Sequence, residues 1–218
     1  LYARAALLLG VHRDTIKRKM IFLSKLSKKK RDLLLKDLSK NPLSHIQIDD
    51  LITIEHTKCK PLSISVVVDP NSRKILSTEV SRIPAFGHLA KVSRRKYGKR
   101  QSELRKGLEK TFLRMKPILT PNALIESDEH QLYSYFIKKI LPHSKHKTFK
   151  SLRGCVVGQG ELKRSSSDPL FKINHTLAML RANINRLFRR SWCTTKDPKM
   201  LSHHLNLYVS FHNEVLVA

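Results

Sequence analysis

Three consecutive segments of this chain have the residue pattern of β-strands and are separated only by short turns. Residues 44–54, 62–68 and 74–80 are rich in β-branched residues, and the first of them alternates apolar and polar side chains. Alternation with a period of two places successive side chains on opposite faces of a strand. Residues 69–72 have the composition of a type I turn, with Pro70 in the position that favours it. The sequence therefore predicts an antiparallel meander of three strands.

Helical and extended patterns alternate after the meander. Within residues 91–116, apolar residues recur at positions 104, 108, 112 and 115, which is the spacing of an amphipathic helix with a basic outer face. The remaining patterns predict a buried strand at 123–125, a helix at 132–140, a strand within 148–157, and helices at 173–188 and 201–216. This order predicts an α/β fold, in which a mixed sheet with an antiparallel start and a parallel continuation is flanked by helices.

The N-terminal segment, residues 1–42, has the pattern of a helix-turn-helix followed by basic linker helices. An alanine-rich stretch is interrupted by Gly10, Val11 returns to an apolar position, and a polar and basic stretch follows. In a DNA-binding helix-turn-helix the second helix would enter the major groove, although an ordinary αα-hairpin has the same pattern. Residues 17–40 continue as one basic helix or a helix pair, which Asn41-Pro42 ends. We expect residues 43–218 to form the second domain.

Positive charge is the dominant feature of the composition. The chain carries 43 Lys and Arg residues against 17 Asp and Glu residues, which gives a net charge of +26 and a pI near 10.4. A positive field concentrates polyanions, and neutralising phosphates releases counterions, so we expect double-stranded DNA as the partner. A ribosomal or membrane-surface protein would share this charge. The basic residues here, however, lie in segments that have the pattern of an ordered fold.

Nothing in the sequence predicts a membrane span or a disulfide framework. The chain has no run of about eighteen apolar residues, as a membrane helix would need. Cys59, Cys155 and Cys193 are too widely spaced for a disulfide framework or a zinc site. We therefore expect reduced cysteines in a cytoplasmic protein. The first residue is Leu1 and the first segment begins inside a helical pattern, so we also expect further sequence upstream.

Two aspartates of this acid-poor chain occupy informative positions. Asp49 lies in the middle of the first predicted strand and Asp128 at the end of the fourth. A carboxylate in a central strand is costly unless it is paired or binds a metal ion, and carboxylates on adjacent strands would form the oxygen-ligand site that Mg²⁺ prefers. Two alternatives stay open. Asp50 could point inward instead of Asp49, because neighbours on a strand face opposite sides, and Asp128 could cap the helix that follows it.

Three motifs stand in order along nearly the whole chain. They are Ile46-Gln47-Ile48-Asp49-Asp50 followed by a β-meander, Ile125-Glu126-Ser127-Asp128 followed by Tyr133, and the helix from Asn174 to Arg190 followed by residues 191–196. In this order and spacing, and with the upstream helix-turn-helix, they resemble the transposases of bacterial insertion sequences. The catalytic core of that family is of the retroviral-integrase and ribonuclease-H-like type.

The resemblance implies a ribonuclease-H-like fold and a DDE-type transposase. Enzymes of this type use two aspartates and a glutamate to bind Mg²⁺ or Mn²⁺, with two ions, and they cleave and transfer DNA strands. By this resemblance, Asp49 and Asp128 take the aspartate positions. The third position, counted back from Leu180-Arg181, is Asn174, whose carbonyl oxygen can bind a metal ion but adds no charge. Glu161 and Asp168 are the other candidates for the third ligand.

The resemblance further implies a protein that acts as a homo-oligomer on terminal inverted repeats and target DNA, in the bacterial cytoplasm at the nucleoid. We expect DNA contacts from polar and basic residues of several predicted helices, namely His12, Arg13, Thr15, Lys17, Arg18, Arg94, Arg95, Lys99, Arg181, Arg189 and Arg190. Some of these arginines would equally fit a solvated basic face. Two other functions stay open: a catalytically inactive transposase-derived DNA-binding protein, which Asn174 favours, and another ribonuclease-H-like nuclease such as a resolvase.

Overall fold

The computed structural model describes residues 2–150, 154–155, 161–162, 168–187 and 194–217. Its helices are α1 (Tyr2–Leu9), α2 (Arg13–Leu38), α3 (Leu89–Tyr97), α4 (Leu104–Met115), α5 (Gln131–Ile140), α6 (Phe171–Asn183) and α7 (Pro198–Phe211), with the short helices η1 (Lys116–Ile118), η2 (Asn185–Leu187) and η3 (His212–Leu216). Its strands are β1 (Leu43–Glu55), β2 (Thr57–Val68), β3 (Ile75–Arg82), β4 (Leu119–Asp128), β5 (Lys145–Phe149), β6 (Gly154–Cys155) and β7 (Glu161–Leu162).

The main sheet has five strands in the order β3-β2-β1-β4-β5. β1, β2 and β3 pair in antiparallel fashion, whereas β4 lies parallel to β1 and β5 parallel to β4. This confirms the predicted meander and the predicted change from an antiparallel to a parallel arrangement, and the sheet is compatible with a ribonuclease-H-like fold. The strand predicted within 148–157 was misplaced. The sheet strand β5 ends at Phe149, and β6 pairs only with β7 in a separate two-stranded sheet.

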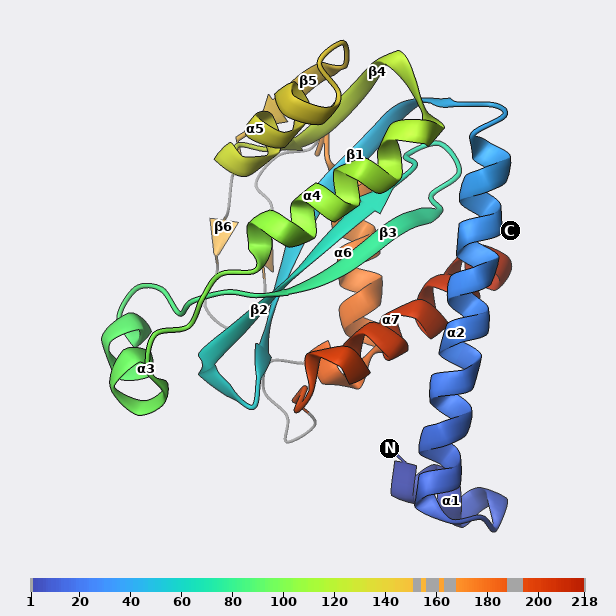
Figure 1. Cartoon of the computed structure of the whole chain (residues 1–218), viewed down its shortest axis with the longest axis vertical. Coiled ribbons are helices and arrows are strands. Elements are labelled where there is room, and N and C mark those ends of the chain that lie inside the picture. The colour runs from blue at the N-terminus through green and yellow to red at the C-terminus, as the bar shows by residue number, and fades with distance from the viewer. Residues whose placement is uncertain (1, 151–153, 156–160, 163–167, 188–193, 218) are drawn as a thin grey trace.

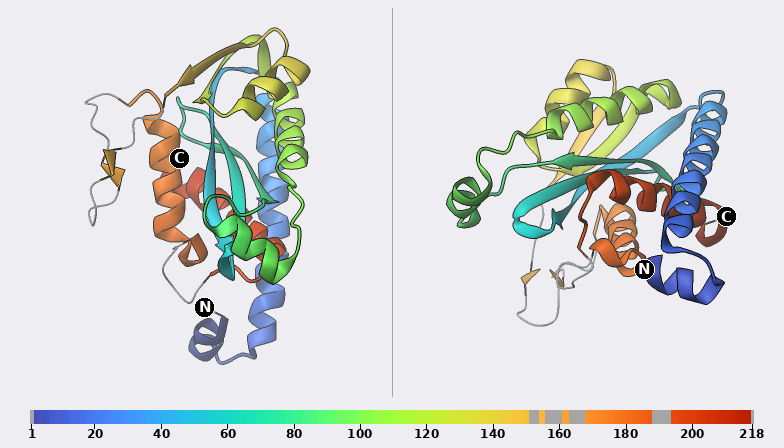
Figure 2. Two further views of the ribbon diagram at one scale, coloured as in Figure 1. Left: turned by 90° about the vertical axis from the view of Figure 1, so that its left-hand side faces the viewer. Right: turned by 60° about the horizontal axis from the view of Figure 1, so that its bottom comes forward.

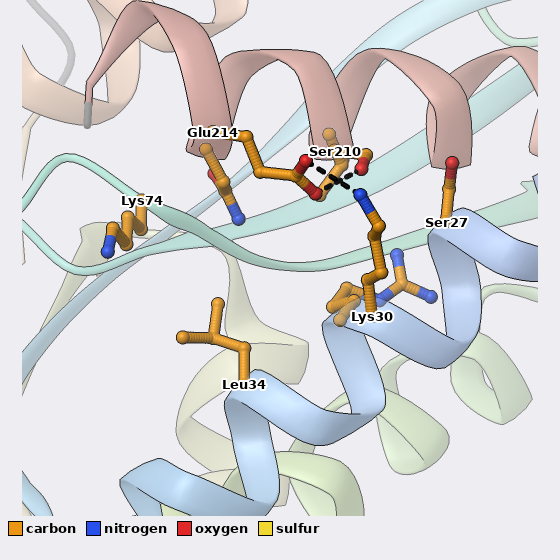
Figure 3. Close-up of a pocket in the computed structure, with 9 residues that line it drawn as sticks. Ser27, Lys30, Leu34, Lys74, Ser210 and Glu214 are labelled. Carbon is orange, nitrogen blue, oxygen red and sulfur yellow. Dashed lines mark hydrogen bonds and ion pairs between the residues drawn. The ribbon is translucent and has the colours of Figure 1, made fainter.

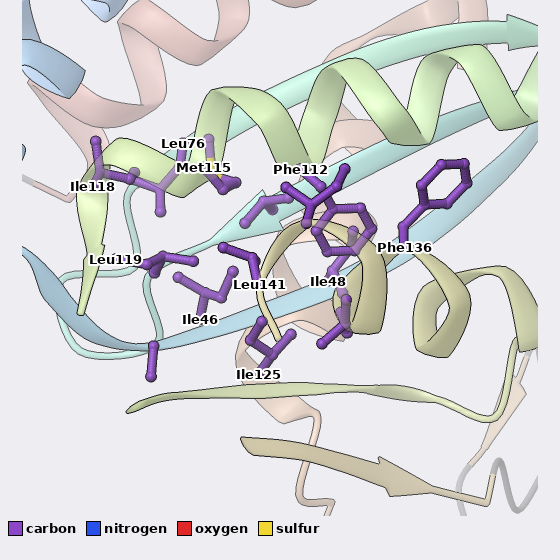
Figure 4. Packing of buried hydrophobic residues seen from close by; sticks show 14 of the residues in the cluster. Ile46, Ile48, Leu76, Phe112, Met115, Ile118, Leu119, Ile125, Phe136 and Leu141 are labelled. Carbon is purple, nitrogen blue, oxygen red and sulfur yellow. The ribbon is translucent and has the colours of Figure 1, made fainter. Parts of the chain in front are cut away.

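Helices cover both faces of the sheet (Figures 1 and 2). On one face, α4 and α5 cover a core in which Ile46 and Ile48 of β1 pack with Phe112, Met115 and Phe136 (Figure 4). On the other face, α6 and α7 cover a second core that contains Leu51 of β1 and the alternate residues of β2. Because β1 contributes to both cores, its even-numbered side chains face α4 and α5, and its odd-numbered side chains face α6 and α7.

The N-terminal helices differ from the predicted arrangement. α1 ends before Gly10, which adopts a left-handed conformation with φ 61°, and α2 then runs without interruption for 26 residues. The segments predicted as a second short helix and a basic linker are therefore one helix. α2 packs on α7, where Ser24 Oγ lies 2.8 Å from His203 Nδ1, and Leu35 belongs to the first core. A helix-turn-helix is not confirmed, and the domain boundary at residue 42 stays a prediction.

None of the helices in the described part of the chain is both long enough and apolar enough to cross a membrane.

The contact between α4 and β3 depends on a glycine. A Cβ atom at Gly107 would collide with the Oγ atom of Ser81, which is almost fully buried. Gly107→Ala should therefore lower the free energy of unfolding by about 1–3 kcal/mol, because the helix would have to move off the strand. Urea unfolding checks this.

The matched variant is the double substitution Gly107→Ala with Ser81→Ala, which removes the obstructing oxygen. This double variant should regain the lost stability and gain up to about 1 kcal/mol from the higher helix propensity of alanine. Equal instability of the single and double variants would show that the close approach of α4 to β3 is not the cause.

The docking of α1 depends on a neutral histidine. Nε2 of His204 on α7 lies 3.0 Å from Tyr2 Oη and accepts a hydrogen bond from Arg186 Nε at 3.2 Å. Burial, reinforced by the positive charge of Arg186, lowers the pKa of His204 from 6.5 to about 4. As the pH falls, His204 is therefore protonated in the unfolded chain before it is protonated in the folded chain. The stability that His204 contributes is complete above pH 6.5 and is lost as the pH falls towards 4.

We therefore expect His204→Gln to flatten the dependence of unfolding free energy on pH between 7.5 and 5 relative to the unmodified chain. Urea unfolding at both pH values measures this difference. The exposed His143 provides the control, since His143→Gln should leave the dependence unchanged. An identical pH profile in the His204 variant would contradict the assignment.

Candidate functional site

The two predicted aspartates lie side by side on one face of the sheet. The parallel register pairs Gln47 with Glu126 and Ile48 with Ser127, so its extension by one residue brings Asp49 beside Asp128. The Gln47 and Glu126 side chains are hydrogen-bonded to each other, and Asp49 and Asp128 each follow that pair by two residues. Because strand side chains alternate, both aspartates face the same way as this pair, towards α6. Neighbouring strands are about 4.8 Å apart, so the two carboxylates can share a ligand.

Asp50 points to the opposite face and cannot belong to this pair. Its carboxyl is enclosed by Ser63 and Ser65 of β2 and by Tyr133 of α5. Burial raises the pKa of Asp50, while the hydroxyls of the two serines act in the opposite direction. Of the two alternatives that the sequence left open, it is therefore Asp50 whose carboxyl points inward, and Asp49 lies on the opposite face of the strand, towards α6.

The hydroxyl of Tyr133 on α5 lies close to the acids of β1 and β4. Its hydroxyl is buried, and its pKa is raised well above the usual value by burial and by the negative charges of Asp50, Asp49 and Asp128. One buried phenol thus senses all three carboxylates from α5. The acids of β1 and β4 consequently form one local concentration of negative charge in a strongly basic chain.

Each aspartate of the pair is held by backbone hydrogen bonds. Asp49 Oδ1 accepts from the Asp50 N–H at 2.7 Å, and Asp128 Oδ1 accepts from the His130 N–H at 3.1 Å. The N-cap of α5 is His130 itself, whose Nδ1 accepts from the Leu132 N–H. Asp128 therefore supports the turn that leads into α5 but is not the cap residue, which corrects the capping alternative.

A buried glutamine fixes the start of α6 over this face. Gln47 Nε2 donates to Glu126 Oε2 at 2.9 Å and to the Pro169 carbonyl at 3.0 Å, and Gln47 Oε1 accepts from the Ile173 N–H at 3.1 Å. Glu126 also lies 2.9 Å from His45 Nε2. The first turn of α6 is therefore tied to β1 and β4 directly beside the aspartate pair.

Asn174 directly follows Ile173, the residue of α6 that Gln47 ties to β1. The buried stripe of α6 is Ile173, Thr176, Leu177 and Leu180. His175 bonds to Arg73 in the turn between β2 and β3, so that flank of the helix faces β2 and β3. Because successive residues are rotated by about 100°, Asn174 and Arg181 lie together on one flank of the buried stripe.

The other candidates for a third ligand are placed differently. Asp168 lies directly before α6, and its Oδ2 accepts a hydrogen bond from Asn174 Nδ2 at 2.9 Å. Glu161 lies in the two-residue strand β7 rather than in a loop, and its side chain lies outside the described residues. Asp168 and Asn174 are therefore the candidates that the fold brings together near the aspartate pair.

Most of the residues predicted to contact DNA are exposed on helices. His12 caps α2, with its Nδ1 accepting from the Asp14 N–H at 3.3 Å. Exposed positions include those at the start of α2 and around the end of α3, namely Arg13, Thr15, Lys17, Arg18, Arg94, Arg95 and Lys99. Arg181 is partly buried, and Arg189 and Arg190 lie outside the described residues. DNA contact by all of these residues stays a prediction.

The best-defined pocket among the described residues lies elsewhere (Figure 3). It is formed between α2 and the C-terminal end of the chain, where Lys30 Nζ lies 2.8 Å from Glu214 Oε2. None of its lining residues belongs to the predicted site. We interpret it as the seam between α2 and α7 rather than as a substrate site.

The donor set of the candidate site is oxygen-rich but contains only two carboxylates beside Asn174. Among the described residues, no group of three or more His, Cys, Asp and Glu side chains is arranged to hold a metal ion. The predicted ligands Asp49, Asp128 and Asn174 include an asparagine, so they are not a group of this kind. Two carboxylates and an amide carbonyl are nevertheless the oxygen ligands that Mg²⁺ and Mn²⁺ accept.

Gln47 and Glu126 were not predicted as site residues. The sequence did contain a signal for them: each lies two residues before one of the aspartates and therefore on the same face of its strand. It could be interpreted only once the register between β1 and β4 was known. No family model and no curated protein matches the sequence of this chain.

The Gln47 tie generates a stability prediction. Gln47→Leu keeps most of the side-chain volume but leaves the Pro169 carbonyl, the Ile173 N–H and Glu126 without this partner. We expect a loss of about 2–3 kcal/mol in unfolding free energy, because buried polar groups would lose their bonds. The control is Thr53→Val on the same strand, an equally buried position whose hydroxyl has no hydrogen-bond partner among the described residues, so this variant should not lose stability. Similar stabilities for both variants would show that the tie contributes little.

Proposed function

We propose that the chain is a DDE-type transposase that cleaves and transfers DNA strands with Mg²⁺ or Mn²⁺. The observation that carries this proposal is the register that puts Asp49 and Asp128 on one face of adjacent parallel strands, beside the tie between Gln47 and the start of the helix that carries Asn174. The five-stranded mixed sheet is compatible with the ribonuclease-H-like core of that family. The ordered motifs of the sequence give the same assignment independently of the fold.

The residues of the site fit a divalent cation. Asp49 and Asp128 would hold it through carboxylate oxygens and Asn174 through its amide carbonyl, which are the hard oxygen donors that Mg²⁺ prefers. Such ions, when bound, promote attack by a water or a 3′-hydroxyl on a phosphate and stabilise the leaving oxygen. The part played by the chain is to fix these oxygens on a rigid sheet and on the tied start of α6.

The charge of the chain supports a DNA substrate. The net charge of +26 would attract the phosphate backbone, and the basic residues on α2 and α3 that would contact it are exposed. Arg181 lies on the same flank of α6 as Asn174 and would bind a phosphate near the reacting bond. Asp49 and Asp128 offset this positive charge locally. The chain would thus bind DNA over a wide surface and act on it at one acidic point.

The deciding experiment is nicking of supercoiled plasmid DNA by the full chain with Mn²⁺, compared with Asp49→Asn and Asp128→Asn. Both substitutions keep the side-chain shape and remove one charge. Because bound metal ions contribute several kcal/mol to such reactions, we expect each variant to lose at least about 100-fold in rate. DNA affinity, measured by fluorescence anisotropy, should not fall, since the substitutions remove negative charge.

The exposed neighbour Glu129 supplies the control, since Glu129→Gln should nick at the original rate. Absence of nicking together with intact DNA binding would favour the second candidate, a catalytically inactive transposase-derived DNA-binding protein. Asn174 in place of the family's glutamate is the observation that favours this candidate. Nicking that survives both aspartate substitutions would overturn the assigned site.

A further inference from the structure

The side chains of Asp168 and Asn174 form a pair whose geometry bears on the third ligand. We propose that Asp168 is a positioning residue, which fixes the amide of Asn174 with its carbonyl oxygen turned towards the aspartate pair. This inference rests on the proposed function. It also explains how the site could work with an uncharged residue in its third position.

Each carboxylate oxygen of Asp168 accepts a hydrogen bond from the start of the segment that forms α6. Its Oδ1 accepts from the Leu170 N–H at 3.1 Å, and its Oδ2 accepts from Asn174 Nδ2 at 2.9 Å. Its backbone carbonyl accepts from the Phe171 N–H at 2.9 Å. Asp168 therefore holds the turn that leads into α6 and also holds a side chain in the first turn of that helix.

The chemistry of the two groups determines which end of the amide faces Asp168. An ionised carboxylate only accepts hydrogen bonds, whereas a carboxamide donates through nitrogen and accepts through oxygen. Nδ2 of Asn174 must therefore face Asp168, and Oδ1 is held on the far side of the amide. Without Asp168, rotation of the amide by half a turn would exchange the two atoms at little cost.

Asp168 can hold the amide in place because its own backbone is fixed. The next residue, Pro169, accepts the hydrogen bond from the buried Gln47 on β1. The strand that carries Asp49 and the loop that carries Asp168 are therefore joined directly. The orientation of the Asn174 carbonyl is thereby fixed relative to the strand, not only relative to its own helix.

The charge of Asp168 adds to this effect. A carboxylate hydrogen-bonded to the far side of a metal ligand orients the ligand and increases its basicity. Asp168 would in this way polarise the Asn174 amide and raise the negative partial charge on Oδ1. It would supply, indirectly, part of the charge that a glutamate in the third position would bring.

Asp168→Asn tests the orientation. The new side chain has a single oxygen, which keeps the bond to the Leu170 N–H, and it then presents an NH₂ group to Asn174. The Asn174 amide should turn round to accept from that group and withdraw its oxygen from the site. We expect Mn²⁺ binding by the full chain, measured by isothermal titration calorimetry without DNA, to weaken by about 10- to 100-fold.

A second variant separates orientation from simple damage. In Asp168→Asn combined with Asn174→Asp, the carboxylate at position 174 accepts from the new NH₂ group with one oxygen and presents the other to the metal ion. Mn²⁺ affinity should return to at least the original value. The control is Asp197→Asn before α7, where the carboxylate likewise accepts from the N–H two residues on, that of Lys199, and it should leave Mn²⁺ binding unchanged.

The outcomes distinguish this inference from the proposed function. If Asp168→Asn binds Mn²⁺ as well as the original chain, while Asp49→Asn does not bind, the positioning role is wrong and the metal site stands. If the single variant loses binding and the double variant does not recover it, the positioning role is again wrong, because Asp168 would then be a ligand itself. If the original chain binds no Mn²⁺, both the proposed function and this inference fail.

Discussion

Gln47 is almost fully buried in the middle of the sheet, and its amide joins three parts of the chain. Its NH₂ group binds Glu126 of β4 and the Pro169 carbonyl, and its oxygen accepts from the Ile173 N–H in the first turn of α6. A buried amide that lost these partners would carry a large desolvation cost. The segment from Pro169 to Ile173 can therefore dock in only one place on the sheet. The position of Asn174, the adjacent residue, follows from that contact.

Two neighbouring aspartates of β1 take different environments for a purely geometric reason. Asp50 points towards α5, where Ser63, Ser65 and Tyr133 enclose it and burial raises its pKa. Asp49 points towards α6 and lies beside Asp128. The pleat of the strand separates the two carboxylates, so they do not compete for one site. One of them belongs to the interior and the other to the candidate active surface.

The scarcity of acids in this chain makes their grouping meaningful. Tyr133 is influenced by three carboxylates at once, and Glu126 and Asp168 lie near the same start of α6. In a chain of net charge +26, this negative cluster is the place where a divalent cation would be most strongly attracted. Under the proposed function, DNA phosphates would be attracted to the basic surface outside this cluster. The two tendencies are compatible because a bound cation lets a phosphate approach the carboxylates.

The sequence by itself determined the meander, the helix α4 and the overall charge. Alternation in β1 and the turn at Asp69-Pro70 predicted the meander, and the spacing from Leu104 to Met115 predicted α4, because both depend only on local periodicity. Asp49 and Asp128 could also be singled out, since acids are rare and both stand in predicted strands.

Only the tertiary structure decided which face of β1 meets α6, because alternation defines two faces without saying what covers each. It also decided that Gln47 and Glu126 belong beside the aspartates, which required the register of strands about eighty residues apart. The tertiary structure also showed that α2 is one continuous helix and that Asp168 is hydrogen-bonded to Asn174. These features depend on packing and on hydrogen bonds between side chains in particular orientations, many of them far apart in the sequence. A local pattern of residues does not specify them.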